Sequence, residues 1–209
     1  GGLGSDTITT HDGVDTILGD SGIVQMDADG VNFAQITSTL VGLGDLDVIT
    51  SDDGTKIVVG GDGGDRIDLG VGSAVSSDHI VLGDNGMVTY VAAGASGAGA
   101  PERYETTDLA PIGSQTYDDV ITTGDGNNTI LGGLGSDTLT TGTGTAGTGT
   151  DTILGDNGYV QMSADGAVFL QIASTQLDQG GNDTIVTADG DKIVVGGYGE
   201  DSVTAGAGE

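Results

Sequence analysis

The stretch Gly132-Gly133-Leu134-Gly135-Ser136-Asp137-Thr138-Leu139-Thr140 decides the fold, because it recurs along the chain. Each copy follows the pattern G-G-x-G-x-D-x-U-x, in which U is a large aliphatic residue. Full copies begin at residues 1, 60, 132 and 196. Weaker copies in the same nonapeptide register surround them and carry Asp47, Asp119 and Asp183. Four full copies are a specific indication of a repeat architecture, whereas one copy would mean little.

A longer period lies above the nonapeptide. The intervals between the full copies are unequal, and each interval contains a second motif that begins with Asp and ends on Gly-Asp. This motif covers residues 15–20, 78–84 and 151–156. The chain is therefore expected to divide into repeat modules, which span residues 1–59, 60–131, 132–195 and the start of a further module at 196–209.

Composition restricts the partners of the chain. It has 209 residues with 32 acidic and 4 basic side chains and a net charge of -28, so a folded form repels itself unless a cation neutralises it. Nucleic acids are unsuitable partners for the same reason, and no apolar run of about 18 residues is present that could insert into a membrane. Disorder is the alternative for an acidic chain, but regularly spaced Ile, Val and Leu clusters favour a fold that forms with counter-ions.

The nonapeptide itself suits calcium. Its glycines adopt the dihedral angles that turn backbone carbonyls toward one point, and the Asp that follows adds carboxylate oxygens. Calcium takes six to eight oxygen ligands of these two kinds. The x-U-x segment predicts a short strand whose aliphatic residue points inward. Such a thin core buries little apolar area, so we expect ion binding to supply folding free energy.

These repeats resemble the RTX, or haemolysin-type, calcium-binding repeats of bacterial exoproteins. The resemblance covers about two thirds of the chain and fails in three excursions, at residues 23–44, 87–117 and 159–180. It implies an all-β fold, a right-handed parallel β-roll (β-solenoid) with hairpin excursions, two nonapeptides per turn and several Ca2+ ions between turns. It also implies type I secretion and an extracellular or cell-surface location.

One edge of the predicted roll carries only aspartates. Because one turn takes two nonapeptides, aspartates that are two nonapeptides apart in the sequence should lie side by side. Three pairs have this spacing, and Asp6 joins them by its match with Asp65. The candidate calcium ligands on this edge are Asp6, Asp47, Asp65, Asp119, Asp137, Asp183 and Asp201.

The opposite edge is mixed. Its equivalent positions are occupied by Asp15, Lys56, Asp78, Asn128, Asp151 and Lys192. The two lysines are either exposed side chains of decayed repeats or ammonium groups that replace an ion. In the second case we expect each to pair with the aspartate that shortly precedes it, Asp53 or Asp189, or with a carboxylate of the adjacent turn. Asp15, Asp78 and Asp151 are candidate ligands here, and Asp20, Asp84 and Asp156 complete the set at the ends of the second motif.

The outer faces of the two predicted sheets differ. Beside the aspartate edge the outward residues are mostly threonines, whereas after the mixed edge they are largely apolar and include Leu18, Val81 and Leu131. An apolar outer face must be covered. Residues 23–36 and 159–172 read as hairpins, the first with an Asp-Gly turn, and Met26, Phe33 and Ile36 would form its apolar side. The alternative cover is another copy of the protein.

Catalysis finds little support in the sequence. His11 and His79 are the only histidines, and neither has a partner at metal-ligand spacing. We therefore expect no enzyme but a structural segment of a surface protein, adhesin or filament, with calcium and other copies of itself as partners. The alternatives are the calcium-dependent repeat region of a secreted toxin or hydrolase, and an ice-binding adhesin segment that uses the threonine face.

Overall fold

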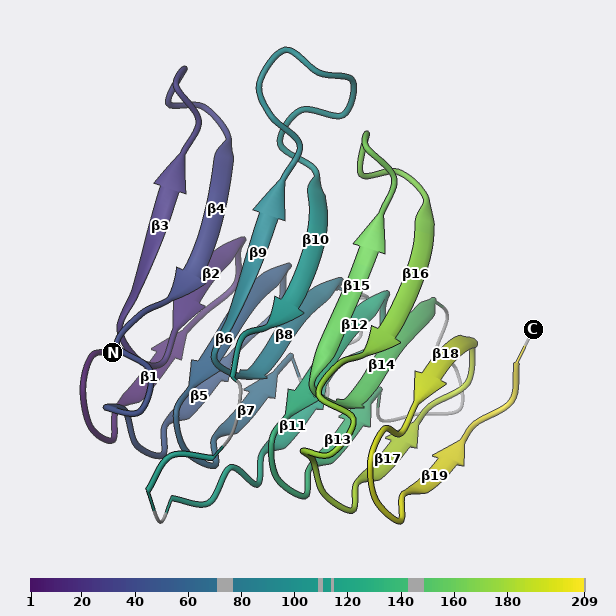
Figure 1. Ribbon diagram of the computed structural model, residues 1–209. Coiled ribbons are helices and arrows are strands. Elements are labelled where there is room, and N and C mark those ends of the chain that lie inside the picture. Colours follow the sequence, from purple (N-terminus) through teal and green to yellow (C-terminus); the bar gives the residue numbers. More distant parts are fainter. Residues whose placement is uncertain (71–76, 109–110, 114, 143–148, 209) are drawn as a thin grey trace.

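The computed structural model describes residues 1–70, 77–108, 111–113, 115–142 and 149–208. These residues form 19 β-strands in three sheets and no helix (Figure 1). The expected all-β class is thereby confirmed. Over the same ranges, no helix is long and apolar enough to cross a membrane.

Sheet A is a 7-stranded parallel sheet in the order β1-β5-β7-β11-β13-β17-β19. Each of its strands is the short x-U-x segment of a nonapeptide, which follows an aspartate. The strands are β1 (Thr7–Thr10), β5 (Val48–Ser51), β7 (Arg66–Leu69), β11 (Val120–Thr123), β13 (Thr138–Thr141), β17 (Thr184–Thr187) and β19 (Ser202–Ala205).

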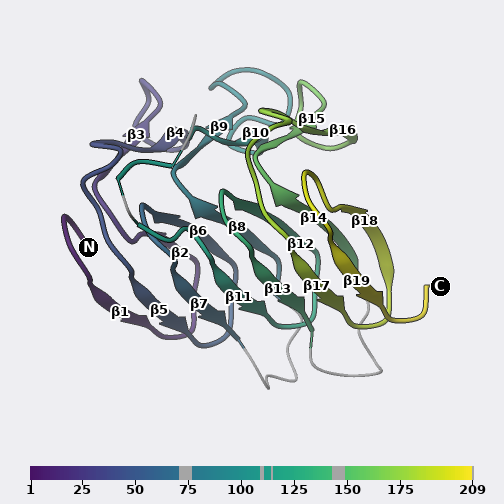
Figure 2. The same ribbon diagram turned by 60° about the horizontal axis from the view of Figure 1, so that its bottom comes forward.

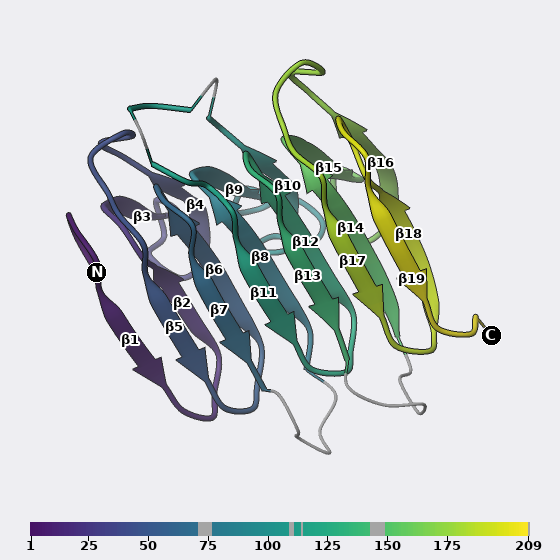
Figure 3. The same ribbon diagram turned by 90° about the horizontal axis from the view of Figure 1, so that it is seen from below.

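Sheet B is a 6-stranded parallel sheet in the order β2-β6-β8-β12-β14-β18. It consists of β2 (Asp15–Leu18), β6 (Lys56–Gly61), β8 (His79–Asp84), β12 (Asn128–Gly133), β14 (Thr150–Asp156) and β18 (Asp191–Val195). The chain passes between sheets A and B, so successive coils lie side by side along one axis (Figure 3). Paired residues of β5 and β7, of β11 and β13, and of β17 and β19 are separated by two nonapeptides in the sequence, as the repeat predicts.

A layer of aliphatic side chains fills the space between sheets A and B. Each strand except β19 contributes one inward residue or two, such as Ile49 and Ile67 from sheet A and Val58 and Ile130 from sheet B, all fully buried. Their neighbours in sequence point to the opposite face because side chains alternate along a strand. The core is therefore narrow, and neighbouring coils are joined mainly by the parallel strand pairing within sheets A and B.

The three excursions form sheet C, an antiparallel sheet in the order β3-β4-β9-β10-β15-β16. Its three hairpins are built from β3 (Gly22–Met26), β4 (Phe33–Ser38), β9 (Gly86–Tyr90), β10 (Pro101–Thr106), β15 (Gly158–Met162) and β16 (Phe169–Ser174). Sheet C lies over the outer face of sheet B (Figure 2), and Ile36, Val88 and Val160 pack there with Val59, Leu82 and other residues of sheet B. The excursions are thus hairpins that cover the apolar face.

One detail of this cover differs from expectation. Ile36 is fully buried and Phe33 packs against the cluster, but Met26 is 40% exposed and does not join it. Its equivalent Met162 packs against the same cluster. The difference follows from position, because β3 is an edge strand of sheet C, whereas β15 has a neighbour on each side.

The second module is out of step with the expected alignment by a single position. His79, and not Asp78, pairs with Lys56 and Asn128 in sheet B. Val81 consequently points into the core between sheets A and B, while Leu82 packs under sheet C. The reason is an extra residue in the motif at 78–84, which must be aligned from its Gly-Asp end. The prediction for the positions of Asp78 and Val81 was wrong.

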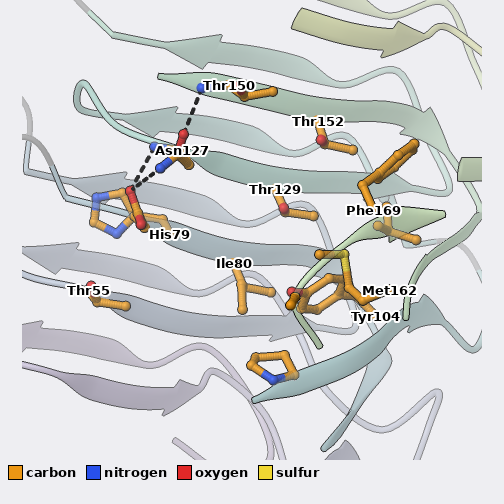
Figure 4. Close-up of a pocket in the computed structure, with 14 residues that line it drawn as sticks. Thr55, His79, Ile80, Tyr104, Asn127, Thr129, Thr150, Thr152, Met162 and Phe169 are labelled. Atoms are coloured by element: carbon orange, nitrogen blue, oxygen red, sulfur yellow. Dashed lines mark hydrogen bonds between the residues drawn. The ribbon is translucent and has the colours of Figure 1, made fainter. Parts of the chain in front are cut away.

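Sheets B and C pack closely at one end and diverge at the other. Near the aspartate edge Leu82, Leu131 and Leu154 fill the interface. Toward the mixed edge a cavity of about 640 Å³ separates the sheets, between Thr129 and Thr152 of sheet B and the Tyr104, Met162 and Phe169 side chains of sheet C (Figure 4).

Candidate metal centre

Seven aspartates form a continuous ladder at the edge where each coil enters sheet A. The backbone N–H of one aspartate donates to Oδ1 of the aspartate in the next coil. For example, Asp47 N lies 2.7 Å from Asp65 Oδ1, and Asp119 N lies 2.8 Å from Asp137 Oδ1. The ladder runs in the order Asp6, Asp47, Asp65, Asp119, Asp137, Asp183 and Asp201. The structure therefore brings together all the aspartates predicted for this edge.

The second carboxylate oxygen of most ladder residues is buried without a hydrogen-bond partner. Among the described residues this holds for Oδ2 of Asp47, Asp65, Asp119, Asp137 and Asp183. A buried polar atom without a partner is costly, and a charged one is more so. Five such atoms in a row indicate that the ladder is built to face a cation.

Glycine carbonyls complete the surroundings of these oxygens. A Cβ atom on Gly132 would overlap both Asp137 Oδ2 and the carbonyl oxygen of Gly155. A Cβ atom on Gly83 would likewise overlap Asp119 Oδ2 and the carbonyl oxygen of Gly132. The arrangement recurs at Gly19, Gly60 and Gly155. Each is a cradle, defined here as the space beside a repeat glycine where one carboxylate oxygen and one carbonyl oxygen of a neighbouring coil meet.

The cradles fit a hard divalent cation. Calcium accepts carboxylate and backbone carbonyl oxygens in flexible geometry, and water fills its remaining positions. No group of three or more His, Cys, Asp or Glu side chains meets at one point in the part of the chain that the structure describes. A carboxylate oxygen beside a backbone carbonyl oxygen is consistent with calcium and poorly suited to zinc, which prefers imidazole nitrogen and thiolate sulfur.

Burial and mutual repulsion disturb the ionisation of the ladder when no cation balances it. Burial raises the pKa of Asp183 to about 7 and the pKa of Asp65 to about 9. Burial and the neighbouring Asp137 and Asp65 carboxylates raise the pKa of Asp119 well above its usual value. The ladder therefore takes up protons unless a positive ion is present.

Asp20, Asp84 and Asp156 lie beside the ladder and accept hydrogen bonds from backbone amides of the following glycine turn. Asp20 Oδ2 accepts from Asp62 N at 2.7 Å, Asp84 Oδ2 accepts from Leu134 N, and Asp156 Oδ2 accepts from Tyr198 N. They fix the turn in the next coil. Their role as calcium ligands stays a prediction.

A buried acidic group near the base of the second hairpin was not anticipated. Asp62 and Asp108 flank Asn85, whose Nδ2 donates to Oδ1 of both at 2.7 Å and 3.3 Å. Burial raises the pKa of Asp108 to about 6. Oδ2 of Asp62 also accepts the backbone N–H groups of Gly42, Leu43 and Gly44. Asn85 directly follows the second motif, and Asp62 belongs to the nonapeptide copy that begins at residue 60. Asp108 and residues 42–44 come from excursions that follow no period, so the group could not be predicted from the repeat.

The mixed edge is organised differently. Lys56 Nζ donates to Asp15 Oδ2 at 2.8 Å, so the lysine pairs with a carboxylate of the adjacent coil. It donates to the backbone carbonyl oxygen of Asp53 and not to the Asp53 carboxylate. The hydrogen bond between Lys56 and Asp15 holds the pKa of Asp15 below its usual value. Asp78 is exposed and accepts from Asn127 (Figure 4).

The remaining positions of this edge also carry N–H donors. Asn128 Nδ2 donates to Asp151 Oδ1 at 3.0 Å, and Asp151 Oδ2 accepts from Thr141 Oγ1 at 2.6 Å. Lys192 Nζ donates to the carbonyl oxygens of Gly190 and Ala207. Asp15 and Asp151 are thus satisfied by protein donors.

The fold and the ladder agree with the comparison to known families. The model of the RTX calcium-binding nonapeptide repeat matches 4 copies, in residues 1–24, 115–145 and 179–209. The chain therefore carries RTX calcium-binding repeats, and the resemblance noted in the sequence is confirmed. The copy at 60–68 lies outside the matched segments, although β7 occupies the same place in sheet A. No curated protein and no solved structure matches the chain.

Proposed function

We propose that the chain is a calcium-binding structural segment of a secreted bacterial surface, adhesin or filament protein, which folds into a right-handed parallel β-roll when calcium binds. The observation that carries the proposal is the row of buried Oδ2 atoms along the aspartate ladder. Each faces a glycine carbonyl of a neighbouring coil, so that one calcium ion could join two coils.

Electrostatics supports folding that depends on calcium. The net charge is -28, and the ladder concentrates seven carboxylates at a single edge without a lysine or arginine among them. The core between sheets A and B is one layer of aliphatic residues. Binding free energy is folding free energy when the site does not exist in the unfolded chain.

A structural role is favoured over catalysis. His11 is exposed and pairs with Asp52 at 2.8 Å, while His79 is buried inside the coil. Burial and the nearby Lys56 ammonium lower the pKa of His79 to about 4, which makes it a weak base. Secretion by a type I route and self-association into a layer or filament are inferred from the repeat family and from the exposed outer face of sheet A.

A circular dichroism titration of the chain tests the proposal. Calcium is added from chelated to millimolar levels, and magnesium serves as the control, because magnesium demands a more rigid octahedral geometry. We expect β-sheet signal to appear with calcium and not with magnesium. A chain that is equally folded in chelator would contradict the proposal.

Ice binding is a second candidate, favoured by the outer face of sheet A. Threonines align there across strands, and Thr9 Oγ1 lies 3.1 Å from Thr50 Oγ1. Thr122 and Thr140 are also paired, whereas the Arg66–Asp68 ion pair interrupts the face. A thermal hysteresis measurement on the calcium-loaded chain tests this candidate. A gap between the melting and freezing temperatures would support ice binding, and the absence of a gap would rule it out.

A further inference from the structure

A buried ammonium group lies inside the mixed edge. Lys56 begins β6 and stands between Asp15 of β2 and His79 of β8 in the register of sheet B. Its side chain has 0% exposure. A buried charge is costly unless surrounding polar groups replace the water it has lost. The groups that contact Lys56 Nζ therefore indicate which kind of cation this position can bind.

Four oxygens surround Lys56 Nζ. The backbone carbonyl oxygens of His11 and Gly13 and the Asp15 Oδ2 atom each lie at 2.8 Å, and the carbonyl oxygen of Asp53 lies at 3.1 Å. Three of these oxygens come from the first coil and one from the second. These four oxygens are called the cage here. An ammonium group has three N–H donors, so the cage has one acceptor more than the ammonium group has donors.

The oxygens of this cage are of the kind found in the cradles of the aspartate ladder. Both combine one carboxylate with backbone carbonyls of glycine-containing turns, and both join neighbouring coils. We propose that the Lys56 ammonium is the resident cation of a calcium-type site, which closes this point of the mixed edge to calcium. The inference rests on the proposed calcium binding of the ladder.

A later position along the edge, Asn128, supports this assignment. Asn128 Nδ2 donates to the carbonyl oxygens of Gly124 and Gly126 as well as to Asp151. A side-chain donor thus occupies the same place in a later coil. The alternative, an exposed lysine of a decayed repeat, disagrees with the complete burial of Lys56 and its four acceptors.

Two variants of the whole chain test the assignment by counting bound calcium with native mass spectrometry at saturating calcium. Lys56→Asp removes the ammonium and supplies a second carboxylate beside Asp15. Lys56→Met fills similar volume with neither charge nor oxygen. We expect Lys56→Asp to bind about one calcium more than the wild-type chain, and Lys56→Met to bind the wild-type number.

The outcomes separate this inference from the proposed function. Wild-type protein that binds no calcium contradicts the proposed function itself. Wild-type protein that binds calcium, with no additional ion in folded Lys56→Asp, overturns the Lys56 assignment alone.

A measurement on the wild-type chain applies even where the variants do not fold. The chain has two lysines, Lys56 and Lys192, so 15N-lysine NMR resolves the Lys56 ammonium group with little ambiguity. We expect its protons to exchange slowly with water at saturating calcium. Rapid exchange, as from an ammonium displaced by calcium, would overturn the assignment.

Discussion

The two edges of the coil handle buried charge in opposite ways. The inward positions of the ladder hold seven aspartates. The six inward positions of the mixed edge are Asp15, Lys56, His79, Asn128, Asp151 and Lys192. There, two carboxylates balance two ammonium groups, and His79 is neutral at pH 7 because its pKa is lowered to about 4. Under the proposed function, the ladder would take its cations from solution, whereas the mixed edge carries the Lys56 and Lys192 ammonium groups of the chain itself.

The comparison implies that the two edges depend on calcium to different degrees. Calcium on the ladder would neutralise the carboxylates and join the coils, whereas the contacts of the mixed edge in the folded chain would need no calcium ion of their own. The following predictions test whether the edges differ in this way.

The largest effect is expected for Asp137→Ala in the middle of the ladder. The substitution removes a carboxylate and leaves the Gly155 carbonyl without it. We expect the calcium concentration at the folding midpoint to rise roughly tenfold or more, equivalent to about 1.4 kcal/mol or more, with Asp65→Ala behaving alike. Calorimetry and circular dichroism measure the shift. Asp178→Ala, which removes an exposed charge, is the control, and equal midpoints for all three variants would contradict the ladder as the calcium site.

Lys56→Met should destabilise the chain by roughly 2–3 kcal/mol, because buried carbonyls and Asp15 lose their donor. Added calcium should not restore the loss, since the methionine side chain fills the cage. Urea unfolding at two saturating calcium concentrations measures both points. Recovery of the wild-type stability at the higher concentration would mean that the mixed edge also depends on calcium.

The edges should also respond differently to pH. In calcium-free buffer the raised pKa values of Asp65, about 9, and Asp183, about 7, mean that the folded ladder binds more protons than the unfolded chain. The free energy of unfolding should therefore increase as pH falls from about 9 to about 4. The pKa of Asp15 is lowered, so its contribution is present at neutral pH and is lost only in stronger acid.

Circular dichroism of the calcium-free chain at several pH values checks this dependence. We expect little β-sheet signal in chelator at neutral or higher pH, and we expect that signal to increase as pH falls toward 5 and the ladder takes up protons. A parallel series in saturating calcium should show the opposite trend below about pH 4, because protonated aspartates release calcium. A metal-free chain with the same β-sheet signal at pH 8 and at pH 5 would count against the buried ladder.

The smallest effect is expected for Lys192→Met. The Lys192 side chain is partly exposed and donates to two carbonyl oxygens without a carboxylate. We expect a loss of about 1 kcal/mol or less, typical of a net hydrogen-bond contribution. Urea unfolding beside Lys56→Met makes the comparison, and equal losses would show that burial of Lys56 adds nothing.

The sequence was sufficient for features that depend on the period of two nonapeptides. The pairing of Asp47 with Asp65 and of Asp119 with Asp137 follows from their spacing together with the two nonapeptides per turn that the resemblance to RTX repeats implies. The hairpins follow from alternating apolar residues around a turn. The paired role of Lys56 was also foreseeable, because Asp15 occupies the equivalent position one coil earlier.

Other features depend on insertions and chain paths that a period does not describe. The added residue in 78–84 moved His79 into the place expected for Asp78. The contact of Asp108 with Asn85 depends on how the second hairpin returns to the coil. Exposure of Met26 depends on its place at the edge of sheet C.

The most direct test of the account is a crystal structure of the calcium-loaded chain with anomalous diffraction data. We predict calcium peaks beside Oδ2 of Asp47, Asp65, Asp119, Asp137 and Asp183, and none beside Lys56 Nζ. Peaks absent from the ladder, or a fully occupied calcium next to Lys56, would contradict the account.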